Sequence, residues 1–264
     1  MKNDSGGMAQ FTVLAQHYDE LNRGADFKAT ADFIESVFKL YGIAPSLVLD
    51  AACGTGNLTI ELDKRGYDMI GLDISDAMLS VALGKKRRGN ILFIKQDMRN
   101  FELYGTVDAI ICAYDSINYL ETLADVGLFF KNAANYLNPG GILIFDINSR
   151  YKFEYILGNN CFTLEGQDVF CSWQSRYSKR KKICRHDLTI FAQTDEGLYR
   201  RFDETQYEYY HAPEELIAML KDTGFTDVRV FFDNDTNLEH ISGKIGSSGE
   251  SKRQRVCIAA KLHS

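Results

Sequence analysis

The sequence predicts an α/β fold, a doubly wound, seven-stranded, mostly parallel sheet with an inserted antiparallel β cap. Two observations predict this fold. Up to about residue 150, short apolar segments alternate with segments of helical periodicity, and the apolar segments are nearly continuous, as in strands buried on both faces. From Phe162 to Tyr210 apolar and polar residues alternate instead, which predicts the cap. The 264 residues, 45% of them hydrophobic, suffice for a sizeable core.

The elements of the first half follow from periodicity and from their end signals. Apolar residues spaced by four, three, four and three predict a first helix from Phe27 to Tyr41 that ends near Gly42. Strands and helices then alternate, with strands at SLVLDA, MIGLDI, ILFIKQ and VDAIICAY and helices over about 57–65 and 76–83. A helix with an apolar stripe from Val126 to Leu137 is stopped by NPGG at 138–141, and a buried strand follows at 142–148.

The second half begins with the cap. Alternating segments predict three or four antiparallel strands, joined by turns near Gly166, Lys181 and Glu196–Gly197. A helix then starts at Pro213, where proline and neighbouring acids suit a first turn, and it stops at Gly224. Two closing strands, VRVFF and VCIAAKL, are separated by a Gly/Ser-rich connection over 242–251.

Composition limits the possible partners. The formal charge of −6 disfavours nonspecific binding to nucleic acid or to anionic lipid, so a small-molecule partner is expected. The N-terminus lacks the pattern of a secretory signal and no apolar run is long enough for a membrane span, which predicts a cytoplasmic protein. The six cysteines form no CxxC pair, so we expect buried, reduced thiols and neither a zinc site nor disulfides. The oligomeric state has no signal in the sequence.

The stretch VLDAACGTGNLT, residues 48–59, reads as a strand that ends in a glycine turn and enters a helix. This form is typical of adenosine-cofactor sites, because glycine lets the backbone approach a ligand closely. A dinucleotide site has the pattern G-x-G-x-x-G, but here Gly54 and Gly56 are followed by Thr59 at the third position. At the strand end stands Asp50, whose charge repels a pyrophosphate and suits a cation. S-adenosylmethionine carries an ammonium, a sulfonium and no phosphate, so its positive charge suits a site that contains this carboxylate.

Two more acids follow the next two strands. Asp73 ends the strand in IGLDIS, 17 residues after Gly56, where a carboxylate can accept hydrogen bonds from both ribose hydroxyls. Asp97, in IKQDMRN, is placed to take the adenine amino group, with the backbone amide of Met98 beside it. Any one of these acids also fits a surface turn, but three at successive strand ends indicate one adenosine site.

These motifs, with VDAIICAY and the later LNPGGILIFDIN in this order and spacing, resemble the class I S-adenosylmethionine-dependent methyltransferases over about residues 48–148. The resemblance implies a Rossmann-like fold whose last strand is antiparallel beside the sixth, and S-adenosyl-L-methionine as cofactor with S-adenosyl-L-homocysteine as product. It implies a cofactor-binding domain of residues 1–160 and 211–264, and a cap of residues 161–210 like that of glycine and amino-sugar N-methyltransferases. The cofactor-lining residues that it implies are Asp50, Ala51, Cys53, Gly54, Gly56, Asp73, Ile74, Asp97, Met98 and Tyr114.

Methyl transfer is an in-line displacement that needs a closed site and neither a protein nucleophile nor a metal. In small-molecule relatives an N-terminal Tyr folds over the methyl donor; Tyr18 matches it, and a core role fits equally well. In YDSINYL, Asp115 is placed to pair with a cationic amine and Tyr119 to orient the acceptor. Amino-sugar enzymes have a His at about the place of Tyr119, so the obvious base is missing here. Further candidates for substrate contact are Asn148, Arg150, Trp173, Arg176 and His211.

We therefore expect methyl transfer to a small molecule, with an amine nitrogen as the first choice. One alternative is an RNA-directed methyltransferase, since KRKK at 179–182 could contact RNA. Another is a nicotinamide-dependent oxidoreductase, which the missing third glycine, Asp50 and the lack of a Tyr-x-x-x-Lys pair disfavour. A binding protein that keeps the fold and the ligand without catalysis is the third alternative.

Overall fold

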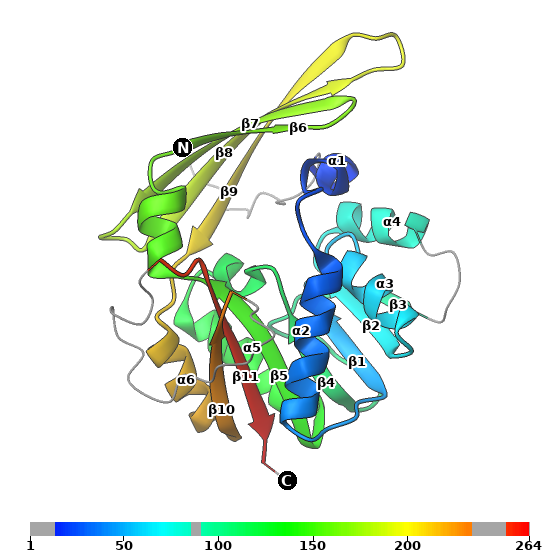
Figure 1. Cartoon of the computed structure of the whole chain (residues 1–264), viewed down its shortest axis with the longest axis vertical. Coiled ribbons are helices and arrows are strands. Elements are labelled where there is room, and N and C mark those ends of the chain that lie inside the picture. The colour runs from blue at the N-terminus through cyan, green and yellow to red at the C-terminus, as the bar shows by residue number, and fades with distance from the viewer. Residues whose placement is uncertain (1–13, 86–90, 234–251, 264) are drawn as a thin grey trace, which may run out of the picture.

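The architecture is α/β, as expected, and contains two sheets (Figure 1). The computed structural model describes residues 14–85, 91–233 and 252–263, so the connection expected over 242–251 lies outside the described residues. The larger sheet has seven strands in the order β10-β11-β5-β4-β1-β2-β3. They are β1 (Leu47–Ala51), β2 (Asp68–Asp73), β3 (Leu92–Lys95), β4 (Val107–Cys112), β5 (Leu137–Asn148), β10 (Phe225–Phe232) and β11 (Arg255–Leu262).

The strand directions confirm the expected topology. Strands β1 to β5 pair in parallel. The last strand, β11, is antiparallel to both of its neighbours and lies between β5 and β10. The carboxyl ends of the parallel strands therefore meet at one edge of the sheet, which is where ligands bind in open α/β sheets.

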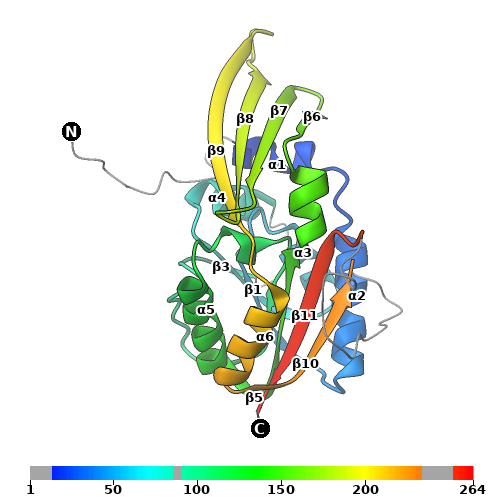
Figure 2. The ribbon, with the colours of Figure 1, turned by 90° about the vertical axis from the view of Figure 1, so that its left-hand side faces the viewer.

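Helices cover both faces of the larger sheet (Figure 2). On one face, α2 (Phe27–Leu40) and α3 (Asn57–Lys64) bury their apolar stripes against the strands, and on the other face α5 (Leu123–Tyr136) and α6 (Pro213–Asp222) do the same. The helix α4 (Asp76–Lys85) packs on β2 and β3. Two clusters of buried side chains result, one on each side of the sheet, which is the arrangement that the near-continuous apolar strands predict.

The start of β5 differs from the prediction. Leu137, expected on the preceding helix, is the first residue of the strand and pairs with Val107. Pro139 explains the change, because a proline disfavours helical geometry at the residue before it and cannot donate a helical hydrogen bond. The chain then passes so close to its neighbours that a Cβ on Gly141 would lie 2.9 Å from the carbonyl oxygen of Asp108.

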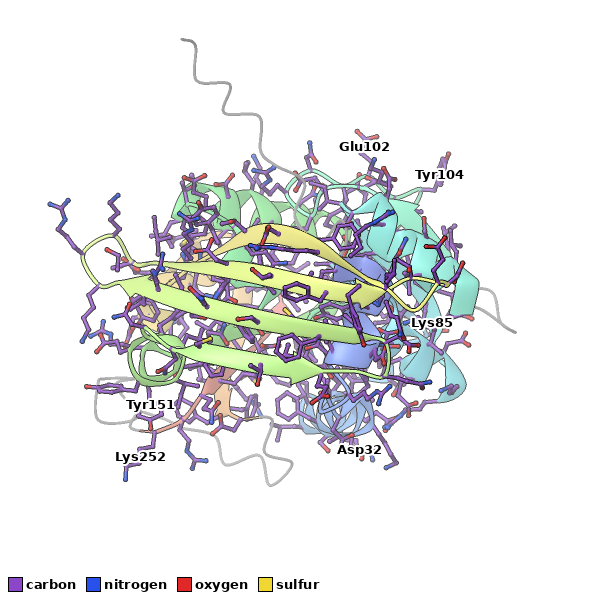
Figure 3. The ribbon with its side chains drawn as sticks, turned by 90° about the horizontal axis from the view of Figure 1, so that it is seen from above. Asp32, Lys85, Glu102, Tyr104, Tyr151 and Lys252 are labelled. Carbon is purple, nitrogen blue, oxygen red and sulfur yellow. The ribbon has the colours of Figure 1, made fainter. Side chains whose placement is uncertain are left out.

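The smaller sheet is the predicted cap, with four antiparallel strands in the order β6-β7-β8-β9. Its strands lie across the top of the molecule (Figure 3). The expected turns near Gly166, Lys181 and Glu196–Gly197 are present between consecutive strands. The strands are β6 (Cys161–Glu165), β7 (Val169–Ser178), β8 (Ile183–Gln193) and β9 (Tyr199–Tyr209).

A short helix, α1 (Leu14–Leu21), lies beneath the cap (Figure 1). Leu14 and Leu21 pack against cap residues that include Val169 and Ile190, so the helix and the inner face of the smaller sheet share one apolar cluster. Tyr18, a candidate site residue, lies on this helix, but the sequence predicts no helix here. Eight residues without an acidic first turn or a basic last turn carry too little local signal.

Polar contacts tie α1 to the larger sheet's helices. Asp19 accepts hydrogen bonds from Thr55 Oγ1 at 2.6 Å and from Asn57 Nδ2 at 2.7 Å, beside the glycine turn. Lys85, the last residue of α4, forms an ion pair with Asp19 at 2.6 Å. These contacts lower the pKa of Asp19 even though its partial burial acts in the opposite direction. The helix is thereby held over the glycine turn.

Two expectations from composition can be compared with the structure. All six cysteines are free; four are buried and Cys53 is half-buried, but Cys161 is exposed on the edge strand β6. The expectation of buried thiols therefore fails for Cys161, which sits on the solvent side of an alternating strand. In the part of the chain that the structure describes, no helix is both long and apolar enough to cross a membrane.

Candidate active site

A cavity of about 1020 Å³ lies between the carboxyl ends of the parallel strands, α1 and the cap. Its lower wall comes from the turns after β1, β2, β3 and β4, and its upper wall from Tyr18 on α1 and from cap residues such as Trp173 and Glu208. The expected site residues that line it are Tyr18, Asp50, Cys53, Gly54, Asp73, Ile74, Asp97, Met98, Tyr114, Asp115 and Tyr119. One cavity thus collects residues from both halves of the predicted site.

Two expected residues, Ala51 and Gly56, are not among those that line the cavity. Ala51 is fully buried in the core of the sheet. Gly56 has a φ of +74°, and a Cβ there would lie 2.9 Å from the Phe93 ring and 3.1 Å from the Cβ of Ala82. The glycine is therefore required by backbone conformation and packing, and it shapes the turn from behind.

Asp50 lies at the end of β1, is 2% exposed, and accepts a hydrogen bond from Thr59 Oγ1 at 2.6 Å. Burial raises the pKa of Asp50 to about 7; the bond from Thr59 opposes this shift and the nearby charge of Asp73 adds to it. Thr59, which replaces the third glycine of a dinucleotide motif, thus holds the carboxylate. Among the described residues no Lys or Arg forms an ion pair with Asp50, so a bound cation would lower its pKa.

Asp73 lies at the end of β2 and is 8% exposed. One carboxylate oxygen accepts the Gly54 amide and the other accepts the Ser75 amide, each at 2.8 Å. The carboxylate therefore joins the glycine turn to the start of α4. Burial raises the pKa of Asp73, and the backbone bonds only partly oppose the shift. Each oxygen keeps lone-pair capacity for a further donor, such as a ribose hydroxyl.

Asp97 follows β3 and is more exposed than the other two acids. Its carboxylate pairs with Arg99, which also reaches Asp125 at 3.1 Å. Partial burial would raise the pKa of Asp97, but the bonds from Arg99 outweigh it and lower the pKa. Met98 beside it and Ile74 after β2, which is 62% exposed, complete this end of the cavity.

The turn after β4 contributes Tyr114 and Asp115, whose φ angles of +58° and +53° are unusual outside glycine. Both backbone amides donate to the Asp146 carboxylate, at 2.7 Å and 2.9 Å, which holds the turn in this conformation. The Tyr114 hydroxyl is 2.9 Å from Thr30 Oγ1. Burial raises the pKa of Tyr114 to about 12.

Asp115 stays ionised although it is half-buried. Burial would raise its pKa, but the charges of Lys152 and Arg255 and a hydrogen bond from Asn148 lower it. Tyr119 lies near this carboxylate, and burial together with the charges of Glu208 and Asp115 raises the pKa of Tyr119 far above its usual range. The phenol is therefore a neutral hydrogen-bond donor at physiological pH.

Four residues in or beside this end of the cavity were absent from the predicted site or only among its further candidates; one of those candidates, Asn148, is fully buried and does not line the cavity itself. Asn148 Nδ2 donates to Asp115 Oδ2 at 3.0 Å and to Glu208 Oε2 at 2.6 Å. Lys152 Nζ donates to Asn148 Oδ1 at 2.7 Å. His186 Nε2 lies 3.2 Å from Glu208 Oε1. The alternating pattern of the cap strands could have indicated His186 and Glu208, because these two polar residues stand at positions where the pattern places buried apolar residues.

The other candidates for substrate contact separate clearly. Trp173 lines the cavity. His211 Nε2 donates to the Leu120 carbonyl oxygen at 2.9 Å, Arg150 stacks over Tyr210, and the exposed Arg176 pairs with Asp187. These three side chains are outside the cavity lining and serve the packing of the cap.

A doubly wound parallel sheet with an acid after each of its first three strands defines a protein that binds an adenosine cofactor. The residues present fit S-adenosylmethionine, because Asp50 and Asp73 are buried carboxylates without a Lys or Arg partner within 4.0 Å in the described ranges. Asp73 suits the ribose hydroxyls and Asp50 suits an ammonium, whereas a pyrophosphate would face both negative charges.

Comparisons with known proteins agree. The family described as "Methyltransferase domain" matches residues 48–141. A Bacillus subtilis (strain 168) protein named "Putative methyltransferase YqeM" is 37% identical over 222 residues, which cover 83% of this chain and 88% of that protein. The crystal structure of an S-adenosylmethionine-dependent methyltransferase from Clostridium acetobutylicum ATCC 824 has a TM-score of 0.80 and 30% identity, covering 96% of this chain and 98% of the other.

A more distant relative is the dTDP-3-amino-3,4,6-trideoxy-alpha-D-glucopyranose N,N-dimethyltransferase of Streptomyces venezuelae. It is 33% identical over 124 residues, which cover 47% of this chain and 52% of that enzyme. The chain belongs to the S-adenosylmethionine-dependent methyltransferases.

We expect the affinity for S-adenosylmethionine to depend on the protonation of Asp50. Its pKa of about 7 in the free protein means that a cationic ligand must displace a proton below that pH. The dissociation constant should therefore rise up to about tenfold for each pH unit between about pH 7 and about pH 5.5, and level off above pH 7. Calorimetric titration across this pH range measures the dissociation constant. Asp50→Asn should bind more weakly at neutral pH and lose this dependence; an unchanged pH profile in the variant would contradict the assignment.

Proposed function

We propose that this methyltransferase transfers the methyl group to an amine nitrogen of a small molecule. The observation that carries the proposal is the single cavity, which continues from the acids of the adenosine site to the carboxylates of Asp115 and Glu208 beneath the cap. A volume of about 1020 Å³ accommodates a cofactor and a small acceptor together. An acidic wall suits an acceptor that arrives as a cation.

Cap residues line this cavity from above, and we propose that residues 161–210 act as the roof of the acceptor site. Tyr18 supports this arrangement, because it belongs to the apolar cluster shared by α1 and the cap and also lines the cavity. The two roles considered for Tyr18, core packing and cover of the methyl donor, are therefore compatible. A macromolecular acceptor would have to displace α1 or the cap to reach the cavity.

Bound S-adenosylmethionine supplies an electrophilic methyl group on a sulfonium sulfur. The chain's own residues supply enclosure and orientation, which account for most of the acceleration in such displacements. Asp115 provides a fixed negative charge for the incoming amine, and Tyr119 provides a neutral hydroxyl that can orient it. Tyr18 and the cap exclude water. These roles extend to this chain the chemistry in the name of the Streptomyces venezuelae relative, which is an amino-sugar N,N-dimethyltransferase.

The RNA alternative has little support from the basic hairpin tip. Lys179 pairs with Glu154 at 2.7 Å and Lys182 faces Glu215 at 3.8 Å, so two of its four cations already have acidic partners. Acidic partners weaken a phosphate-binding patch, because they cancel its field. We therefore keep the small-molecule acceptor.

The test is to incubate the protein with methyl-labelled S-adenosylmethionine and, separately, with a metabolite extract or total RNA. We expect label in a small molecule that gains one methyl group on nitrogen, as identified by mass spectrometry and NMR. An incubation with Asp73→Ala protein is the control, and it should yield no labelled product. Label in RNA, or on an oxygen or carbon atom of the product, would overturn the proposal.

A further inference from the structure

We propose that Glu208, held by Asn148 and lying beside His186, is the anchor that binds the acceptor's amine as an ammonium ion and takes up its proton. This inference rests on the proposed function and assigns a residue to it. Glu208 lies on β9 in the cap, is 4% exposed and lines the cavity. It stands at the acceptor end of the cavity because Asn148 links it to Asp115.

The first step is the charge on Glu208. Of the described residues, no Lys or Arg lies within 4.0 Å of its carboxylate, whereas Asp115 and Asp146 share Arg255, at 3.4 Å and 3.3 Å. The donor to Glu208 Oε2 is the neutral amide of Asn148. The orientation of this amide is fixed, because Lys152 can only donate to its oxygen and carboxylates can only accept from its nitrogen. Buried charges are normally paired, so Glu208 lacks a cation that a ligand would provide.

The second step is the protonation of His186, which is 1% exposed and also lines the cavity. Trp173 Nε1 donates to His186 Nδ1 at 2.9 Å, and Ser175 Oγ lies at the same distance from Nδ1. Because an indole N–H can only donate, Nδ1 must be unprotonated and the proton sits on Nε2. The ring is therefore neutral and does not neutralise Glu208.

The third step is the vacant hydrogen-bonding capacity beside Glu208. His186 Nε2 is buried, lies 3.2 Å from Glu208 Oε1, and yet is outside hydrogen-bond geometry. A buried donor without a partner is costly, so its position needs an explanation. A ligand that draws Oε1 toward itself would bring the carboxylate into line with this N–H. Trp173, whose ring centroid is 5.3 Å from that of His186, provides an aromatic wall that also attracts cations.

The proposed reaction begins with a protonated amine whose N–H bond faces Glu208. This N–H bond breaks and an O–H bond forms on Glu208, which frees the nitrogen lone pair. The lone pair then forms the N–C bond to the methyl group while the C–S bond breaks and its electron pair remains on sulfur. The methylated nitrogen carries the positive charge, and Glu208 returns its proton to water when the product leaves. Burial assists the first transfer because it destabilises both charged partners.

The test uses benzylamine and its uncharged analogue benzyl alcohol as probes, titrated by calorimetry into protein saturated with S-adenosylhomocysteine. At pH 7 we expect benzylamine to bind at least about tenfold more tightly than benzyl alcohol, without release of a proton to the buffer. Glu208→Gln should lose this preference and bind the amine with release of about one proton, as judged in buffers of different ionisation enthalpy. His186→Asn, which keeps an acceptor for Trp173, should weaken the preference.

Asp203→Asn is the matched control, because Asp203 is an exposed carboxylate on the same strand that pairs with Arg201. It should behave like the wild type. The proposal is overturned if Glu208→Gln keeps the preference for the amine, or if the wild type has none. This outcome is distinct from a failure of the proposed function: a labelled oxygen or carbon product would refute N-methylation, whereas an N-methylated product formed equally by Glu208→Gln would refute only the anchor.

Discussion

Asp73→Ala is expected to remove most of the stabilisation that S-adenosylhomocysteine gives the protein. Two ribose hydroxyls would lose a charged acceptor, and each hydrogen bond to a charged group contributes about 1.5–3 kcal/mol. The dissociation constant should therefore rise on the order of 100-fold. A ligand at about 100 times the wild-type constant stabilises the wild type by about 2.7 kcal/mol, but would stabilise such a variant by only about 0.4 kcal/mol. Thermal unfolding with and without the ligand measures the difference.

Two controls separate a lost contact from a damaged fold. Asp73→Asn keeps the size of the side chain and one oxygen for the Gly54 amide, so it should fold like the wild type and still bind more weakly. Asp76→Ala, three residues further along, removes an exposed carboxylate that pairs with Lys95 and should leave ligand binding unchanged. NAD should stabilise none of these proteins. Full stabilisation of Asp73→Ala by S-adenosylhomocysteine would contradict the role assigned to Asp73.

Arg255→Met should have the largest effect on stability. Arg255 Nη2 lies 3.4 Å from Asp115 and Nε lies 3.3 Å from Asp146, and the guanidinium stacks 5.3 Å from the centroid of the Tyr114 ring. Its loss leaves the buried Asp146 and the half-buried Asp115 without this partner, and breaking a buried pair costs about 3–5 kcal/mol in comparable cases. Both contacts exceed 3 Å, so we expect a loss at the lower end of this range. The free energy of unfolding at pH 7 should fall by about 3 kcal/mol, as measured by urea denaturation.

The pH dependence of this loss has a defined sign. Arg255 lowers the pKa of Asp115, so the stability that it contributes is present at neutral pH and disappears as the pH falls and the carboxylate becomes protonated. The difference between wild type and Arg255→Met should accordingly shrink in acid. Arg253→Met, which removes a half-exposed side chain 3.6 Å from Asp233, should change stability by less than about 0.5 kcal/mol. Equal losses of unfolding free energy in Arg255→Met and Arg253→Met would show that the pairing of Arg255 with Asp115 and Asp146 has no special role.

The sheet could be predicted from sequence because its signals are local. Each buried strand is a short apolar run, and each covering helix has its own stripe and its own stop, as the helix from Phe27 to Leu40 illustrates. The start of β5 could not be predicted in the same way, because Leu137 fits an apolar helical stripe and an apolar strand equally well. The helix α1 escaped prediction because tertiary contacts at Asp19 and Leu14, and not local propensity, hold it.

The two halves of the site also differ in whether local sequence signals predict them. Asp50, Asp73 and Asp97 each end a strand of one parallel sheet, so topology alone brings them together, and spacing along the chain was sufficient to name them. The acceptor end is assembled from residues far apart in sequence. Glu208 and His186 come from the cap, and their position beside Asp115 depends on how the cap docks through Asn148, which no local pattern specifies.

The measurement that tests the central claim most directly is a crystal structure of the complex with S-adenosylhomocysteine. It should show the ribose hydroxyls on the Asp73 carboxylate, the ammonium within ion-pair distance of Asp50, and the sulfur directed toward Asp115 and the cap. A ligand that lay elsewhere, or whose ribose and ammonium touched neither carboxylate, would contradict the assignment of the acids to the cofactor.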